Sequence, residues 1–213
     1  MRSRPFPVVI AAPSGAGKTS LARALVERDP EVVFSVSATT RPAREHETDG
    51  VDYEFVDGAE FDRMLAAGEL VEWAEVHGHR YGTPAHGIAA ALARDELVVL
   101  DIDVQGARQI RRSFPEAVLI FILPPSGDEL VRRLRGRGSE LPEERRRRLR
   151  NARAELHAAG DFDYVVVNDD FESAVGALQA ILAAERRRYP RLVDLDARLE
   201  RIDREVANLV EQE

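Results

Sequence analysis

The feature that most constrains this chain is a glycine-rich stretch that holds its only lysine. Residues 12–19 read Ala-Pro-Ser-Gly-Ala-Gly-Lys-Thr, between an apolar run at 8–11 and apolar residues at helical spacing over 21–26. A strand, a glycine-rich turn and a helix in this order predict a phosphate-binding loop, in which backbone N–H groups and a lysine hold phosphate oxygens. A chain that otherwise uses arginine keeps lysine where a compact point charge is needed. Ala12 stands where the general motif has glycine.

Five short apolar runs alternate with helical patterns along the chain. They lie at residues 8–12, 32–36, 97–101, 117–123 and 164–168. This alternation predicts an α/β fold with a five-stranded parallel sheet and flanking helices, like that of P-loop NTPases.

Two segments interrupt the alternation and predict the domain organisation. Residues 38–96 hold a strand-like hairpin and are expected to form an inserted mixed α/β substrate-binding region, whereas residues 125–160, with Gly136 and Gly138 as hinges, are expected to form a helical lid. The core and the tail take the remaining ranges. We expect the core at 1–37, 97–124 and 161–190, and a helical tail at 191–213.

Composition excludes several classes of protein. The 213 residues carry a formal net charge of −8 and no cysteine, which excludes disulfides and thiol catalysis and favours a cytoplasmic location. No stretch approaches the roughly 18 apolar residues of a membrane span, so no membrane contact is expected. The arginine-rich segment 132–153 contains no aromatic residue, and we therefore expect no nucleic-acid binding.

Carboxylates follow the third apolar run. Residues 97–100 are Leu-Val-Val-Leu and lead to Asp101, the form of a strand that places a carboxylate beside the Mg²⁺ of a phosphate-loop enzyme. Asp103 leans to the same side of an extended chain. We therefore expect Thr19 and Asp101 to hold Mg²⁺.

Taken together, these stretches resemble the guanylate kinase family over residues 7–188. The stretches that carry the resemblance are Ala12–Lys18, Ser35–Pro42, Gly50–Tyr53, Tyr81–Thr83, Leu100–Gly106, Arg133–Gly138 and Val167–Asp170. The resemblance implies that the γ-phosphoryl group of ATP is transferred to GMP, and to dGMP as well, giving ADP and GDP. It also implies a core, a lid and a GMP-binding region, which corresponds to the insertion.

The resemblance assigns roles to individual residues. ATP is expected to contact Pro13, Ser14, Gly15, Ala16, Gly17, Lys18, Thr19, Ser20, Arg137 and Asn168. GMP is expected to contact Ser37, Arg41, Arg44, Tyr53, Glu72, Tyr81, Thr83, Asp101 and Asp103. The reaction itself is expected to depend on Lys18, Arg41, Arg137 and Arg148, with Arg133 as a second-rank candidate.

The chemistry of guanine agrees with this assignment. Guanine offers two adjacent donors, N1–H and N2–H₂, which one carboxylate can accept, whereas adenine presents an acceptor at N1. From the residues alone, Glu72 and Glu75 are equal candidates for that carboxylate, and the resemblance favours Glu72. Trp73, between them, is expected in the core. Which of Asp101 and Asp103 serves the metal and which the guanine stays open.

Two other functions are compatible with the fold. One is a catalytically inactive, guanylate-kinase-like interaction module, in which the nucleotide site has become a peptide-binding surface. The other is a related kinase that phosphorylates a ribose phosphate. Lys18 and Asp101 argue against the first, and the base-reading set Ser37, Glu72 and Thr83 argues against the second.

The tail predicts self-association. After Pro190, apolar residues are spaced 3, 4, 3, 4, 3, which is the a/d seam of a coiled coil. They are Leu192, Leu195, Leu199, Ile202, Val206 and Leu209. In a parallel pair Arg191 would face Asp196, and Arg198 would face Asp203. We expect a homo-oligomer through residues 191–210, the alternative being a tail helix that lies against its own core.

Overall fold

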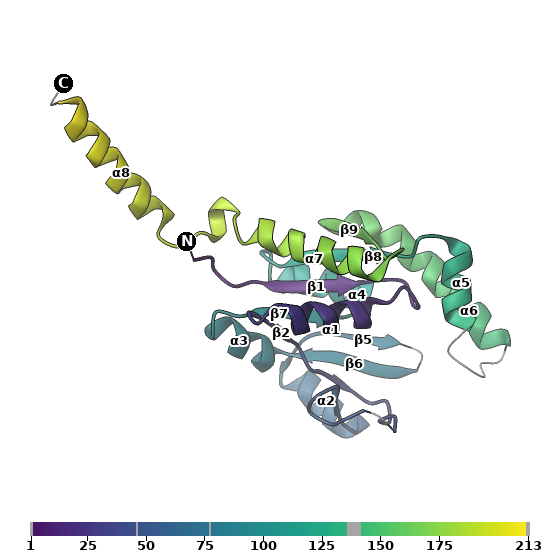
Figure 1. Cartoon of the computed structure of the whole chain (residues 1–213). Helices are drawn as coiled ribbons and strands as arrows, with labels where there is room; N and C mark the ends of the chain where they lie inside the picture. Colours follow the sequence, from purple (N-terminus) through teal and green to yellow (C-terminus); the bar gives the residue numbers. More distant parts are fainter. Residues whose placement is uncertain (1, 46, 77, 136–141, 212–213) are drawn as a thin grey trace.

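A five-stranded parallel sheet forms the centre of the molecule (Figure 1). The computed structural model describes residues 2–45, 47–76, 78–135 and 142–211. The strand order is β2-β7-β1-β8-β9, and each neighbouring pair is parallel. The strands are β1 (Pro7–Ala11), β2 (Val32–Phe34), β7 (Leu97–Asp101), β8 (Val118–Leu123) and β9 (Tyr164–Val167). The predicted five-stranded parallel sheet is confirmed.

Helices cover both faces of this sheet. Helices α1 (Lys18–Arg28) and α7 (Phe171–Glu185) pack on one face, and α3 (Ala85–Ala93) and α4 (Val104–Ser113) pack on the other. Alternate residues of β1 contribute to the two layers, and all five are buried. Burial on both faces explains why the strand reads as an unbroken apolar run.

A second, mixed sheet is built from the inserted segment, in the order β4-β3-β6-β5. Its strands are β3 (Ser37–Thr39), β4 (Tyr53–Phe55), β5 (Leu70–Val76) and β6 (His79–Pro84). Strands β5 and β6 form the predicted antiparallel hairpin, while β3 was not predicted as a strand. Helix α2 (Gly58–Ala66) packs on this sheet through Phe61 and Met64.

Two helices occupy the segment expected to be a lid. Helices α5 (Gly127–Arg135) and α6 (Pro142–Leu156) pack together through a small apolar cluster, and a short 3₁₀ helix, η1 (His157–Asp161), follows. The cluster consists of Leu130, Leu134, Leu149 and Ala152. The expected hinges Gly136 and Gly138 lie outside the described residues.

The tail helix projects away from the body of the molecule (Figure 1). Helix α8 (Leu195–Val210) follows a 3₁₀ turn, η2 (Tyr189–Arg191), and none of its residues is buried. The helix therefore does not lie against its own core. None of the helices in the described part of the chain is long and apolar enough to cross a membrane.

The seam predicted for the tail is shorter in the structure than in the sequence. Leu192 precedes the helix, and Asp194 has a φ of +63°, so the helical seam begins at Leu195. Arg191 turns inward, and Asp196 accepts a hydrogen bond from the hydroxyl of Tyr189 at 2.6 Å. The predicted contact of Arg191 with Asp196 of a second copy is therefore wrong.

Arg191 joins a buried polar cluster where the tail leaves the core. Its guanidinium donates to Glu185 Oε2 at 3.0 Å and lies 3.7 Å from the centre of the Phe6 ring. Tyr164 donates its hydroxyl to Glu185 Oε1 at 2.6 Å, and Glu185 is 2% exposed. Burial raises the pKa of Glu185, but the hydrogen bonds from Tyr164, Arg191 and Arg188 outweigh it and hold the pKa below its ordinary value.

We predict that Glu185→Gln lowers the free energy of unfolding by about 3 kcal/mol, because Arg191 is left buried without a countercharge. The measurement is urea unfolding at neutral pH. Since the pKa of Glu185 is lowered in the folded state, its stabilising charge is present above about pH 4.3 and is lost as the pH falls, so the difference from wild type shrinks in acid.

The matched control is Glu172→Gln on the same helix, whose partner Arg28 is on the surface. Because an exposed pair contributes little, this variant should unfold close to wild type. Equal effects of the two substitutions would contradict the role given to the buried cluster.

Candidate active site

The phosphate-binding loop joins β1 to α1 at the carboxyl edge of the central sheet. Gly15 and Gly17 both have a φ of +92°, a conformation that favours glycine. A Cβ on Gly17 would also lie 2.6 Å from Nδ2 of Asn168. Both glycines of the sequence motif are therefore required by the shape of the loop.

Asn168 supports this loop from behind. Its side-chain amide donates to the backbone carbonyl of Ala16 at 2.8 Å, and its backbone carbonyl accepts from the guanidinium of Arg133 at 3.0 Å. Asn168 is 6% exposed and Ala16 is 1% exposed. Both residues were predicted to contact ATP; their side chains are buried in the packing around the loop, and the predicted contacts stay a prediction.

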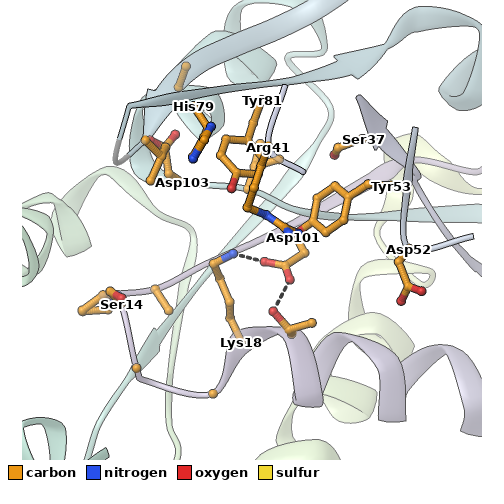
Figure 2. A pocket seen from close by; sticks show the side chains of 18 of the residues that line it. Ser14, Lys18, Ser37, Arg41, Asp52, Tyr53, His79, Tyr81, Asp101 and Asp103 are labelled. Atoms are coloured by element: carbon orange, nitrogen blue, oxygen red, sulfur yellow. Dashed lines mark hydrogen bonds and ion pairs between the residues drawn. The ribbon is translucent and has the colours of Figure 1, made fainter. Parts of the chain in front are cut away.

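Lys18 and Asp101 meet at the mouth of the loop (Figure 2), and Thr19 contacts the same carboxylate. Lys18 Nζ contacts Asp101 Oδ1, and Thr19 donates its hydroxyl to Asp101 Oδ2 at 2.5 Å. Desolvation lowers the pKa of Lys18, but the charge and hydrogen bond of Asp101 raise it more, so the net pKa lies above its ordinary value. Lys18 is therefore an ammonium ion at neutral pH.

The same group has the chemistry of a magnesium site. The carboxylate of Asp101 and the hydroxyl of Thr19 are hard oxygen donors of the kind Mg²⁺ takes in phosphate-binding enzymes, and they touch each other. Both residues line one cavity together with Lys18. These residues fit the ion that the sequence predicts.

Arg41 lies across the cavity from Lys18, beside two tyrosines (Figure 2). Its guanidinium donates to Glu47 Oε1 at 2.8 Å and lies 5.3 Å from the centre of the Tyr53 ring. The rings of Tyr53 and Tyr81 meet edge to face with centroids 6.0 Å apart. Arg44 lines the same region, with a side chain that is 62% exposed.

Glu47 was not predicted as a site residue. The hydrogen bond from Arg41 holds its pKa below the ordinary value, against the effect of burial. It also accepts from the backbone N–H of Arg44 at 2.8 Å. Glu47 therefore fixes the position of Arg41.

Glu72 is a buried carboxylate in the second sheet. It is 4% exposed, and Oε1 accepts from the hydroxyl of Thr83 at 2.6 Å. Burial raises the pKa of Glu72 to about 7. Ser37, on β3, lines the same cavity, while Thr83 is buried behind Glu72.

Strand alternation separates the two acidic candidates of β5. Glu72 and Ala74 are buried and line the cavity, whereas Trp73 and Glu75 lie on the opposite face and are exposed. Trp73 is 43% exposed, so its predicted place in the core is wrong. A strand has a period of two, and residues three apart must face opposite sides.

Asp103 has a structural role besides its place in the cavity. Its side chain caps α4 by accepting from the backbone N–H of Gly106 at 2.8 Å. One carboxylate oxygen is therefore engaged in holding the start of the helix. Asp101, by contrast, is the carboxylate that meets Lys18 and Thr19.

Helix α6, in the segment expected to be a lid, reaches the loop between β1 and α1 through two side chains. Arg148, which is 9% exposed, donates to Ser14 Oγ at 3.0 Å, and Glu155 accepts from the Ser14 backbone N–H at 3.2 Å. Burial raises the pKa of Glu155. Glu155 was not predicted, although its position seven residues after Arg148 places both on one helix face. Arg137 lies outside the described residues.

One cavity of about 1260 Å³ gathers most of the predicted residues. They are Pro13, Ser14, Gly15, Gly17, Lys18, Thr19, Ser20, Ser37, Arg41, Arg44, Tyr53, Glu72, Tyr81, Asp101, Asp103 and Arg148. This volume exceeds the roughly 300–1,000 Å³ of a site for one small ligand. The cavity joins a phosphate-binding loop to a buried carboxylate, as a site for two ligands requires.

Known proteins are similar to this chain in sequence and in fold. Residues 4–185 match the sequence profile of guanylate kinases. The guanylate kinase of Myxococcus xanthus is 51% identical over 186 residues, 87% of this chain and 89% of that protein. The guanylate kinase of Thermobifida fusca is 52% identical over 176 residues, which are 83% of this chain and 90% of that protein. The crystal structure of guanylate kinase from Anaplasma phagocytophilum gives a TM-score of 0.80 at 38% identity, covering 93% of this chain and 95% of that one. The chain belongs to the guanylate kinase family.

Proposed function

We propose that this protein transfers the γ-phosphoryl group of ATP to GMP, giving ADP and GDP, and that it accepts dGMP as well. The observation that supports this function is that Lys18 and Glu72 line the same cavity. Lys18 provides a cation for the phosphates of ATP, and Glu72 provides a buried acceptor for the two donors of guanine. We place the reaction in the cytoplasm.

The transfer requires positioning rather than a general base. A phosphate oxygen of GMP is already a nucleophile at neutral pH; it forms a bond to the γ-phosphorus as the bond to the β–γ bridging oxygen breaks, and ADP leaves. Arg41, Tyr53 and Tyr81 hold the GMP phosphate, while Lys18 and Arg148 neutralise charge on the transferring group. Phosphate oxygens replace Asp101 as the partner of Lys18.

Mg²⁺ would be held by Thr19 and Asp101, beside the phosphates of ATP. When bound, the ion neutralises charge on the β- and γ-phosphate oxygens. Glu47 keeps Arg41 in place before GMP arrives, and Ser37, with Thr83 behind it, completes the surroundings of the base.

The two other functions are less well supported. An inactive interaction module has no need of an intact pair of Lys18 and Asp101. A kinase for a ribose phosphate has no base to bind and no need of a buried carboxylate in the cavity. Burying the Glu72 carboxylate is costly unless a ligand pairs with it.

We predict that ADP release, followed in a coupled assay with Mg²⁺, is rapid with GMP and dGMP and negligible with AMP or a ribose phosphate. Lys18→Arg should abolish the activity with GMP although it keeps the charge, because a planar fork cannot occupy the point-charge position in the loop. Arg150→Lys, on the exposed side of α6, is the matched control and should retain wild-type turnover.

Two results would contradict this prediction. Equal turnover with AMP and GMP would remove guanine as the recognised base. Turnover of folded Lys18→Arg within tenfold of wild type would show that the loop does not need the compact cation.

We predict that Glu72→Gln raises the GMP Michaelis constant with little change in that of ATP, because the amide leaves one guanine donor opposite its own NH₂. An unpaired buried donor costs about 1 to 3 kcal/mol, or roughly 5- to 150-fold. Glu75→Gln, on the exposed face of the same strand, is the matched control.

The charge on Glu72 also makes this binding depend on pH. Its pKa is about 7 in the free protein, and guanine favours the ionised form, so GMP affinity should increase as the pH rises through 7 and level off above it. Titration calorimetry with wild type and Glu72→Gln isolates this effect, because the GMP phosphate titrates equally in both. Parallel pH curves for the two proteins would contradict it.

For α8 we propose a parallel pairing with the same helix of a second copy. Its apolar seam is open to solvent, with Leu199, Ile202, Val206 and Leu209 between 43% and 62% exposed. A lone 16-residue helix without a packed face is marginally stable in water. In a parallel pair Arg198 of each copy faces Asp203 of the other, an attractive contact made twice.

We predict that the full chain is a dimer or larger by light scattering, and that a chain ending at Val193 is monomeric. Ending there keeps Arg191 in its buried cluster. Arg198→Asp should weaken the assembly, because it sets two carboxylates together, and adding Asp203→Arg should restore it. A monomeric full chain, or a shortened chain with the same oligomeric mass, would contradict the pairing.

A further inference from the structure

The outer edge of the second sheet is closed by a side chain from the core. Strand β5 is at the end of the strand order, so its outer peptide groups have no strand to pair with. Gln109, on α4, donates from Nε2 to the carbonyl of Trp73 at 2.8 Å and accepts from the Trp73 N–H at 3.2 Å. Its amide makes the two hydrogen bonds that a neighbouring strand would make.

This contact fixes the peptide that follows Glu72. Residues 72 and 73 share a peptide bond, and the direction in which Glu72 points is set by the backbone at that bond. Thr83, on β6, holds the carboxylate from the other side at 2.6 Å. Glu72 is therefore positioned between its own hairpin and a helix of the core.

Gly106 provides the room that the carboxylate occupies. A Cβ at this position would lie 3.0 Å from the carboxyl carbon of Glu72 and closer still to Oε2. Gly106 is in the first turn of α4, and its φ is not positive, so its backbone does not require glycine. Glycine in a helix costs about 1 kcal/mol relative to alanine. The space that the Glu72 carboxylate needs explains why glycine stands at position 106 in spite of that cost.

We propose that α4 is the positioning element for guanine recognition, with Gln109 holding the strand that carries Glu72 and Gly106 leaving space for its carboxylate. The inference rests on the proposed function, in which Glu72 reads guanine. Neither Gln109 nor Gly106 lines the cavity, and both act through Glu72.

The same segment also ties the two ends of the cavity together. Asp101 ends β7 beside Lys18, Asp103 caps α4, and Gly106 and Gln109 follow on the same helix. Nine residues of continuous chain, 101–109, therefore run from the phosphate end of the site to the base end. The helix that contacts the strand of Glu72 therefore begins three residues after the carboxylate that contacts Lys18.

The experiment compares GMP with IMP, whose base lacks only the 2-amino group. A correctly held carboxylate accepts from both N1–H and N2–H₂ of guanine but from only one donor of hypoxanthine. Gln109→Ala should raise the GMP Michaelis constant about fivefold and lower the GMP-to-IMP ratio of kcat/KM by a similar factor, with the ATP constant and kcat near wild type. Gly106→Ala should act in the same direction.

Arg112→Ala, an exposed change on the same helix, is the control. Gln109→Glu keeps the size of the side chain but loses the donor to Trp73, and provides the same test if Gln109→Ala does not fold. In a Glu72→Gln background, Gln109→Ala should have no further effect on the GMP-to-IMP ratio, because it acts through the carboxylate.

Several results would overturn the inference. One is a GMP-to-IMP ratio that Gln109→Ala leaves unchanged, and another is an effect that adds fully to that of Glu72→Gln. Equal changes in the constants for GMP and ATP would show a general loss of structure instead. A wild-type protein that does not phosphorylate GMP would overturn the proposed function itself, and this inference with it.

Discussion

The contact between Lys18 and Asp101 exists because β1 and β7 are neighbours that end at the same edge of one sheet. Ile10, near the end of β1, is paired with Asp101, the last residue of β7. Parallel strands place the loops that follow them on one side, and ligands of open α/β sheets bind there. The segment leading to α5 and α6 and the supporting Asn168 follow β8 and β9 at this same edge. The whole site depends on this alignment of strand ends.

The free protein already gives several charges of the site a partner. Lys18 is held by Asp101, Arg41 by Glu47, and the loop residue Ser14 by both Arg148 and Glu155. These partners keep long cationic side chains ordered before any ligand binds. In the function we propose, each nucleotide phosphate would exchange with an existing partner, so less conformational entropy would be lost than in ordering a free side chain.

Periodicity and local motifs determined what could be predicted. The five core strands, the loop around Lys18 and the hairpin of β5 and β6 all depend on residues close in sequence. The cavity likewise gathers most of the residues that the family resemblance assigned. The period of a strand also separates Glu72 from Glu75 and puts Trp73 on the face of Glu75, but it does not say which face is buried.

Contacts between distant segments could not be predicted in this way. Gln109 pairs with Trp73, and Glu155 with Ser14, across 36 and 141 residues, and no local pattern marks either. Arg191 is another example: the spacing predicts that it faces Asp196 of a second copy, but its side chain pairs with the buried Glu185 on α7. Polar partners that meet through tertiary packing leave no periodic signal.

The single lysine of the chain gives the protein an unusual chemical surface. Reagents directed at primary amines find only one ε-amino group, in the phosphate-binding loop, besides the α-amino group at the start of the chain. The raised pKa of Lys18 keeps that amine protonated and poorly nucleophilic while Asp101 holds it. An amine-directed reagent should therefore modify the α-amino group first, because the one competing side chain is held as an ammonium ion by Asp101.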